Sequence, residues 1–186
     1  MFILPISNGK YAIVRGEGYV DIPPIQTAVQ THASALDFEP ETSQVGDSEM
    51  QHLDYAYAAS IIRDFMSDQT LILTIRGRKY TPRFEFYAGD YRHRITVHGV
   101  QTEVDAGYEG KNQVVLIEAK NAPSSNVIIR QLYYPFRQWM AHTRKPVKIV
   151  FFEKKDGEYR LWEFGFSDPE DYHSIQLTRS GKYVVV

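Results

Sequence analysis

Cysteine is absent from the sequence of 186 residues. Its absence excludes a disulfide framework, a thiol nucleophile and a thiolate zinc site. Long hydrophobic runs are absent too, since no stretch approaches the roughly 20 consecutive apolar residues of a membrane span. Residues Met1 to Pro5 lack a basic leader followed by an apolar run, so we expect no signal peptide. These absences predict a soluble, cytoplasmic protein without a membrane partner.

The sequence also has little net charge, with a formal value of −2. This value argues against a protein that holds nucleic acid by bulk attraction alone. The charge is uneven, however, with basic stretches at 76–94 and 137–148 and an acidic stretch at 37–54. A basic surface that faces a phosphate backbone is compatible with this distribution. Two ordinary solvated faces are an equally good interpretation.

What is present suits one globular domain. The length lies within the usual range for a single domain, and a hydrophobic fraction of 43% can fill a core. We find no internal repeat, low-complexity tract or linker. Residues 1–186 are therefore predicted to form one domain.

Four segments are predicted in the first half of the chain. Phe2 to Ile6 and Tyr11 to Val14 flank Asn8-Gly9, a dipeptide typical of a hairpin turn. Residues 21–47 are rich in proline and polar residues, which predicts a loop or short helical pieces. A helix is expected from Ser48, because Ser48-Glu-Met-Gln51 has the form of a capping box. An apolar stripe on that helix is expected to face the core, and its members are Met50, Leu53, Tyr57 and Ile61.

Strands predominate after this helix. Apolar patterns predict strands over 71–75, 84–87, 95–104, 114–119, 147–152, 159–166 and 182–186. A second helix is expected after Ser124-Ser125-Asn126, which supply possible caps, and extends to about Met140. Pro135 is expected to kink or divide it. The order indicates an α/β fold in which a central mixed β-sheet is flanked by helices.

The most informative segment contains Asp105, Glu118 and Lys120. Glu109-Gly-Lys-Asn112 supplies turn residues between two strand patterns, so these strands are expected to form an antiparallel hairpin. Asp105 is then expected opposite Leu116 or Ile117, one diagonal step from Glu118. Glu118 and Lys120 point to the same side because side chains alternate along a strand. Three ionisable groups therefore converge at one end of the hairpin.

Two carboxylates with an open side suit a hard cation such as Mg²⁺. We expect Asp105 and Glu118 to be its ligands, with the backbone carbonyl of Ala119 as a further oxygen. Lys120 is expected to orient a water, help to deprotonate it or contact a phosphate, and the sequence leaves these roles open. The simpler alternative is a solvated strand face. It is less favoured because Val114 to Ile117 is typical of a buried strand, beside which an unpaired charge is costly.

Together these residues resemble the PD-(D/E)xK nuclease superfamily, which includes restriction endonucleases. The resemblance rests on Asp105, on Glu118-x-Lys120 after an apolar strand, and on a following helix with Gln131, and it covers about residues 48–152. Val104 stands where the superfamily usually has a proline. The resemblance implies a restriction-endonuclease-like core and Mg²⁺-dependent cleavage of double-stranded DNA, with Asp105 and Glu118 as metal ligands and Lys120 as the catalytic lysine.

Two longer runs, 46–58 and 130–137, are similar to a group of type II restriction enzymes. The whole chain resembles the small subunit of a heterodimeric type IIS restriction endonuclease. That resemblance implies a larger partner subunit, which recognises the DNA sequence and nicks one strand while the small subunit cuts the other. No helix-turn-helix or zinc-finger signature is visible, which agrees with borrowed recognition.

Three further residues are candidates for the site. The superfamily often places a supporting glutamate on the first helix, a role that Glu49 can fill, although capping or dipole stabilisation also explains it. His52 lies one turn later and is expected to contact the site or the DNA. Gln131 is expected to bond a ligand carboxylate or a phosphate, with a buried core amide as the alternative.

Two other functions stay open at this stage. One is a noncatalytic module of nuclease fold that binds DNA or a partner protein. The other is a homodimeric repair or junction-resolving nuclease of the same superfamily. A serine hydrolase is not expected, because no nucleophile-elbow motif is present.

Overall fold

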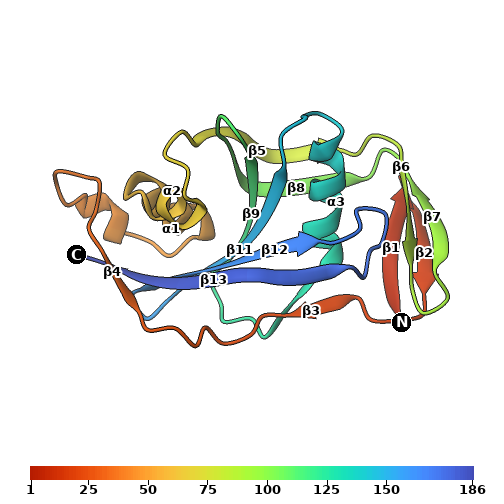
Figure 1. Ribbon diagram of the computed structural model, residues 1–186, viewed down its shortest axis with the longest axis horizontal. Coiled ribbons are helices and arrows are strands. Elements are labelled where there is room, and N and C mark those ends of the chain that lie inside the picture. Colours follow the sequence, from red (N-terminus) through yellow and green to blue (C-terminus); the bar gives the residue numbers. More distant parts are fainter.

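A seven-stranded mixed sheet forms the centre of the molecule (Figure 1). The computed structural model describes residues 1–186, apart from the side chain of Gln44. In the order in which they lie side by side, the strands are β4 (Gln30–His32), β13 (Ile175–Val185), β12 (Glu158–Phe166), β11 (Val147–Lys155), β9 (Val114–Lys120), β8 (Gln101–Glu109) and β5 (Ile72–Tyr80). The β9–β11 and β4–β13 pairs are parallel, and the other neighbours are antiparallel. The predicted α/β fold with a mixed central sheet is thus confirmed.

Helices cover both faces of this sheet (Figure 1). Side chains alternate along β9, so Val115 and Ile117 pack in a cluster with α1 (Glu49–Ala58) and α2 (Ile61–Met66). Val114 and Leu116 point to the opposite side and pack in the cluster that contains α3 (Ile129–Met140). Because both faces are buried, β9 can be apolar along its length until it reaches Glu118.

Smaller elements surround the sheet. They are the hairpins β1 (Phe2–Ser7)–β2 (Lys10–Val14) and β6 (Phe84–Ala88)–β7 (His93–Val97), the pair β3 (Tyr19–Asp21)–β10 (Asn126–Ile128), and a 3-10 helix, η1 (Glu41–Gln44). The predicted first hairpin is confirmed, with Gly9 at a φ of 68° in its turn. Such a φ is readily adopted by glycine because it has no Cβ.

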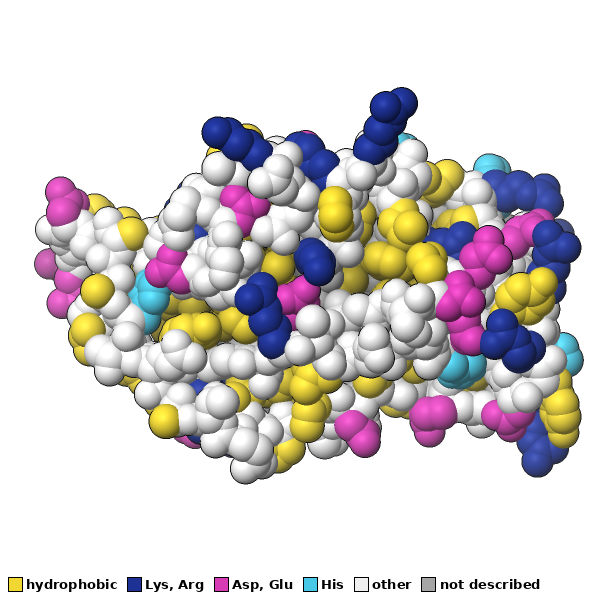
Figure 2. Space-filling view, viewed as in Figure 1, with side chains coloured by type: hydrophobic (Ala, Val, Ile, Leu, Met, Phe, Trp, Pro, Cys, Tyr) yellow, Lys and Arg dark blue, Asp and Glu magenta, His cyan; other side chains and the backbone are white. Residues whose placement is uncertain are grey.

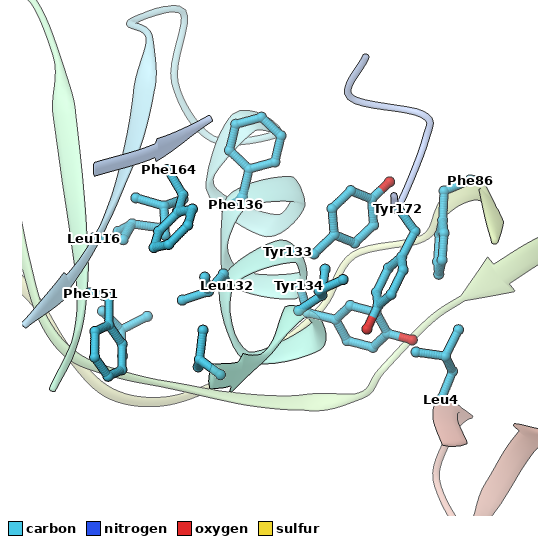
Figure 3. Close-up of a cluster of buried hydrophobic side chains, with 14 of the residues drawn as sticks. Leu4, Phe86, Leu116, Leu132, Tyr133, Tyr134, Phe136, Phe151, Phe164 and Tyr172 are labelled. Carbon is cyan, nitrogen blue, oxygen red and sulfur yellow. The ribbon is translucent and has the colours of Figure 1, made fainter. Parts of the chain in front are cut away.

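Helix α3 lies between the sheet and the hairpins. Figure 3 shows Leu132 near Leu116 and Phe151 of the sheet, and Tyr133 and Tyr134 on the side of Phe86, Tyr172 and Leu4. The Tyr134 hydroxyl donates to the carbonyl of Pro5 at 2.9 Å. This contact ties the first hairpin to the helix that begins beside Glu118 and Lys120.

The first predicted helix is correct at its start and wrong in its length. Ser48 caps α1 by accepting a hydrogen bond from the Gln51 amide at 3.1 Å. The Gln51 side chain does not complete a capping box, because it donates to carbonyls of the preceding loop instead. Ser60, at a φ of 74°, separates α1 from α2. Met50 is 46% exposed, so it does not belong to the apolar stripe, whereas Leu53 is fully buried.

The second predicted helix needs two corrections. Ser124, Ser125 and Asn126 do not cap α3, because Asn126 begins β10 and the helix follows Ile128 without a side-chain cap. Pro135 does not divide the helix, which continues to Met140. Most side chains from Ile129 to Gln138 are buried. Their packing outweighs the one backbone hydrogen bond that a proline removes.

Among the strands, the segment predicted as 95–104 is two strands. β7 ends at Val97 and β8 begins at Gln101, with Gly99 between them at a φ of 67°. β5, β11 and β13 are longer than expected, β8 extends past the expected end at Val104 to Glu109, and the segment 21–47 contains β4 as well as a loop. Pairing with neighbouring strands extends each of these segments beyond its apolar pattern.

The outer surface carries charge unevenly. Figure 2 shows acidic side chains gathered at the end of the molecule that is formed by the loop between β4 and α1, whereas the opposite end carries both signs. In the described part of the chain, no helix is long and apolar enough to cross a membrane.

Candidate active site

Strands β8 and β9 bring Asp105, Glu118 and Lys120 together. The expected register is wrong by one residue or two, because Ala106 pairs with Ile117 and thus places Asp105 at the level of Glu118. On its other side β8 pairs with β5, where Gly107 faces Ile75 and Val104 faces Gly77. β8 therefore has one residue more than β5 between these pairs, which is a β-bulge at Asp105–Ala106. Bulges of this kind redirect a side chain and often lie beside active sites.

Asp105 bridges the two strands at this point. Its Oδ2 accepts a hydrogen bond from the backbone N–H of Ala119 at 2.7 Å. Burial raises the pKa of Asp105, and the Ala119 amide opposes this shift. The bond fixes the carboxylate at the level of Ala119, the residue whose backbone carbonyl is the third oxygen expected for a metal.

Glu118 is the most buried charge of the group. Its side chain is 11% exposed, and its Oε1 accepts from Lys120 Nζ at 2.5 Å and from Gln131 Nε2 at 2.8 Å. Burial raises the pKa of Glu118 to about 7, although Lys120 opposes the shift. The hydrogen bond from Gln131 is one of the two roles expected for that residue.

Lys120 is held as a cation by its neighbours. Burial lowers the pKa of Lys120, but the hydrogen bond and charge of Glu118, with the charges of Glu49 and Asp105, outweigh burial and leave it raised. The side chain is 32% exposed, so the ammonium group is partly open to solvent.

The N-terminus of α1 approaches the same strand end. Glu49 Oε1 accepts from the backbone N–H of Asn121 at 3.2 Å, and the Asn121 side chain donates to the carbonyl of Asp47 at 2.7 Å. The Glu49 charge raises the pKa of both Asp105 and Glu118. Glu49 thus lies near the two carboxylates, as expected.

His52 is placed differently. Its ring is buried, and Nε2 lies 2.6 Å from Asp47 Oδ1, so its contact is with the loop before α1. Neither His52 nor Glu49 lines the pocket that contains Asp105.

Sequence reasoning missed Asn121. It directly follows Lys120, and its Oδ1 is buried without a hydrogen-bond partner in the described structure. The sequence did contain one signal for Asn121, namely its position directly after the candidate catalytic lysine. Its connection to α1 depends on tertiary contact.

A pocket of about 300 Å³ opens over these groups. Its lining residues are Gln101, Thr102, Glu103, Asp105, Glu118, Lys120, Arg130, Gln131, Tyr134 and Pro135. The pocket therefore unites the three ionisable groups predicted from the sequence with the first residues of α3. Arg130 adds a second cation that the sequence did not single out.

The oxygen atoms available suit a cation that keeps much of its own water. Among the residues described, no group of three His, Asp or Glu side chains is arranged to hold a metal ion. Mg²⁺ is commonly bound through one or two carboxylates plus waters and substrate phosphates. Asp105, Glu118 and the Ala119 carbonyl fit that donor set.

Comparison with family models gives one match, to a domain of unknown function, DUF6997, over residues 14–184. The chain belongs to this family. The matched range of the DUF6997 family includes every residue that lines the pocket. Neither the curated proteins nor the solved structures include a match to the chain.

In this DUF6997 chain, most basic side chains between residues 76 and 94 form ion pairs with acidic side chains. Arg76 binds Asp54, and Arg78 binds Glu103. The other pairs join Arg83 and Arg94 to Glu85, and Arg92 to Asp171. This pairing favours the interpretation of the stretch as a solvated face. Glu103 is exposed, pairs with Arg78 and lines the pocket.

Two buried aromatic residues of the domain have clear positions. Tyr134 belongs to the core, and it also lines the pocket. Trp162 is a core residue whose Nε1 donates to the carbonyl of Pro23 at 2.8 Å.

Proposed function

We propose that this protein is a Mg²⁺-dependent endonuclease subunit that hydrolyses a phosphodiester in one strand of duplex DNA. The observation that carries the proposal is the pocket that joins Asp105 and Glu118 to Lys120 at the β-bulge of β8. The order of α1, the β8–β9 hairpin, α3 and β11 agrees with a restriction-endonuclease-like core of the PD-(D/E)xK type.

Asp105 and Glu118 would hold the metal ion, with the carbonyl of Ala119. When bound, Mg²⁺ stabilises negative charge on a phosphate and lowers the pKa of a coordinated water. In the hydrolysis, water adds to phosphorus, the bond from phosphorus to one sugar oxygen breaks, and that oxygen takes up a proton.

The remaining residues position charge around the pocket. The Gln131 side chain donates a hydrogen bond to Oε1 of Glu118, which holds this carboxylate in one orientation before any substrate binds. Lys120 offers an ammonium group that can orient the attacking water or contact the phosphate. Such preorganised charges contribute more than charges that must be reoriented during the reaction.

We further propose that a larger subunit supplies sequence recognition. The support is the resemblance of the chain to the small subunit of a heterodimeric type IIS restriction endonuclease, in which recognition is supplied by the larger subunit. The two alternatives are a noncatalytic DNA- or partner-binding module and a homodimeric repair or junction nuclease.

The test is strand-resolved cleavage of end-labelled duplex DNA with Mg²⁺. Asp105→Asn is expected to lower the rate at least about a hundred-fold, because a metal ligand supplies several kcal/mol of transition-state stabilisation. Asp156→Asn is the matched control, since Asp156 lies in the β11–β12 turn at a φ of 53°, which asparagine tolerates.

Each variant is assayed alone and with any larger chain that co-purifies with the protein from its native cells. The proposal expects the wild type to cut one strand and Asp105→Asn to leave only the partner's nick. An Asp105→Asn mixture that still cuts both strands would show that Asp105 is not a ligand. DNA binding without hydrolysis under every condition would favour the noncatalytic module.

A further inference from the structure

A second and larger cavity, of about 830 Å³, adjoins the candidate active site. We call it the tyrosine groove, because Tyr11, Tyr19 and Tyr80 line it. These residues belong to three separate elements, namely β2, β3 and β5. Gln101 and Arg130 line both the tyrosine groove and the catalytic pocket. The two cavities therefore adjoin, so a strand with one phosphate in the pocket can extend from there into the groove.

The three tyrosine rings are available for contact. Tyr11 is 64% exposed, Tyr19 is 49% exposed and Tyr80 is 69% exposed. Within the described chain they stack on no other ring, unlike Tyr55 on Tyr159 or Tyr57 on Tyr108. Burying one flat face of each ring would remove apolar surface from water. The groove thus offers separate aromatic surfaces along its walls.

The described lining of the groove carries one positive side chain and no acidic side chain. None of its described lining residues is an aspartate or a glutamate, although the chain contains 23 acidic residues. Its charged lining side chain is Arg130, which lies at the junction with the catalytic pocket. Arg130 is therefore placed to contact a backbone phosphate as the strand passes from one cavity to the other.

Aromatic rings can stack only on bases whose faces are free. In duplex DNA each base already stacks on its neighbours, whereas an unpaired strand offers a π-face at every nucleotide. The tyrosine groove offers the aromatic surfaces on which single-strand-binding proteins stack bases, and Arg130 supplies one positive charge beside them.

We propose that the tyrosine groove binds an unpaired stretch of the DNA strand beside the scissile phosphate, with bases stacked on Tyr11, Tyr19 and Tyr80. The inference rests on the proposed nuclease function and narrows its substrate to DNA that is unpaired next to the cut, such as a flap, a fork or a locally opened duplex.

The test is fluorescence anisotropy in EDTA, so that binding is measured without hydrolysis. The probes are a blunt duplex and the same duplex with an unpaired tail of about eight nucleotides, within the usual site size of single-strand binding folds. The wild type is expected to bind the tailed duplex more tightly. Tyr80→Ala and Tyr11→Ala are each expected to weaken tailed binding at least about five-fold and to leave blunt binding unchanged.

Two variants serve as controls. Tyr80→Phe keeps the ring and is expected to bind as the wild type does. Tyr91→Ala removes a ring of similar exposure, 67%, that does not line the groove, so it should have no effect. Equal binding of the two probes by the wild type, or an unchanged preference in Tyr80→Ala, overturns the inference. A Tyr80→Ala variant that loses a co-purifying protein while keeping its preference for the tail assigns the groove to a protein partner instead.

Cleavage with Mg²⁺ is measured in a second assay, so that single-strand binding by the groove and hydrolysis at the pocket are tested independently. Asp105→Asn is expected to lose hydrolysis and to keep its preference for the tail. If the wild type prefers the tailed duplex but does not hydrolyse it, the binding role of the tyrosine groove is supported and the nuclease function is contradicted. If the wild type hydrolyses DNA but does not prefer the tailed duplex, the nuclease function is supported and the binding role of the groove is contradicted.

Discussion

Glu118 shows how one residue can link burial, metal binding and pH. Its carboxylate is buried beside two other acids, Asp105 and Glu49, and Lys120 compensates only part of the cost. The structure therefore holds a group that is unfavourable as a bare anion. A cation at the site would relieve that cost, because it favours the ionised form of every ligand.

This arrangement predicts a pH-dependent response to Mg²⁺. Because the pKa of Glu118 rises from 4.5 to about 7 on folding, its contribution to stability is present below pH 4.5 and is lost as pH rises through 7. Mg²⁺ requires the ionised carboxylate, so apparent affinity is expected to be about ten-fold higher at pH 8 than at pH 6.

The measurement is the increase in Tm with Mg²⁺ at the two pH values. The increase should be larger at pH 8, and Glu118→Gln should abolish the difference while Asp156→Asn retains it. Equal increases at both pH values in the wild type would exclude Glu118 as a ligand whose ionisation is coupled to binding.

At the scale of elements, the start of α1 matters because it carries Glu49 toward the strand end. Ser48 fixes this start by capping the helix, and Asn121 connects it to β9. The site is thus supported by a helix terminus on one side of the sheet and by Gln131 of α3 on the other.

Loss of the cap is expected to cost stability. Ser48→Ala should lower the free energy of unfolding by about 1 kcal/mol, because the Gln51 amide loses its acceptor. Ser48→Gly should lower it by only a few tenths of a kcal/mol, since glycine is itself a good N-cap residue. Urea denaturation of the three proteins measures these differences. An alanine variant as stable as the wild type would show that the cap contributes nothing to α1.

Across the whole molecule, the described residues of the candidate site come from one chain. β8, β9 and α3 supply the residues that line the pocket, and α1 supplies Glu49 beside them. Because the proposed enzyme pairs this chain with a larger subunit, the chain alone is expected to be a monomer by size-exclusion chromatography with light scattering. A stable homodimer that cleaves a branched junction by itself would instead support the repair or junction-resolving alternative.

Local patterns in the sequence were sufficient to predict several elements. The Asn8-Gly9 hairpin, the start of α1 and the apolar strand that ends in Glu118 follow from turn chemistry, capping and hydrophobicity. The grouping of Asp105 with Glu118 and Lys120 was also predictable, because a short turn forces two strands to pair.

Other features depend on contacts between elements and could not be predicted from local patterns. The bulge at Asp105–Ala106 depends on pairing with β5, whose register no local pattern specifies. The continuity of α3 through Pro135 reflects burial between the sheet and the hairpins. The partner of Asn121 and the tyrosine groove join segments far apart in the chain, so they arise from packing between elements. Local sequence specifies elements, whereas these features depend on how the elements meet.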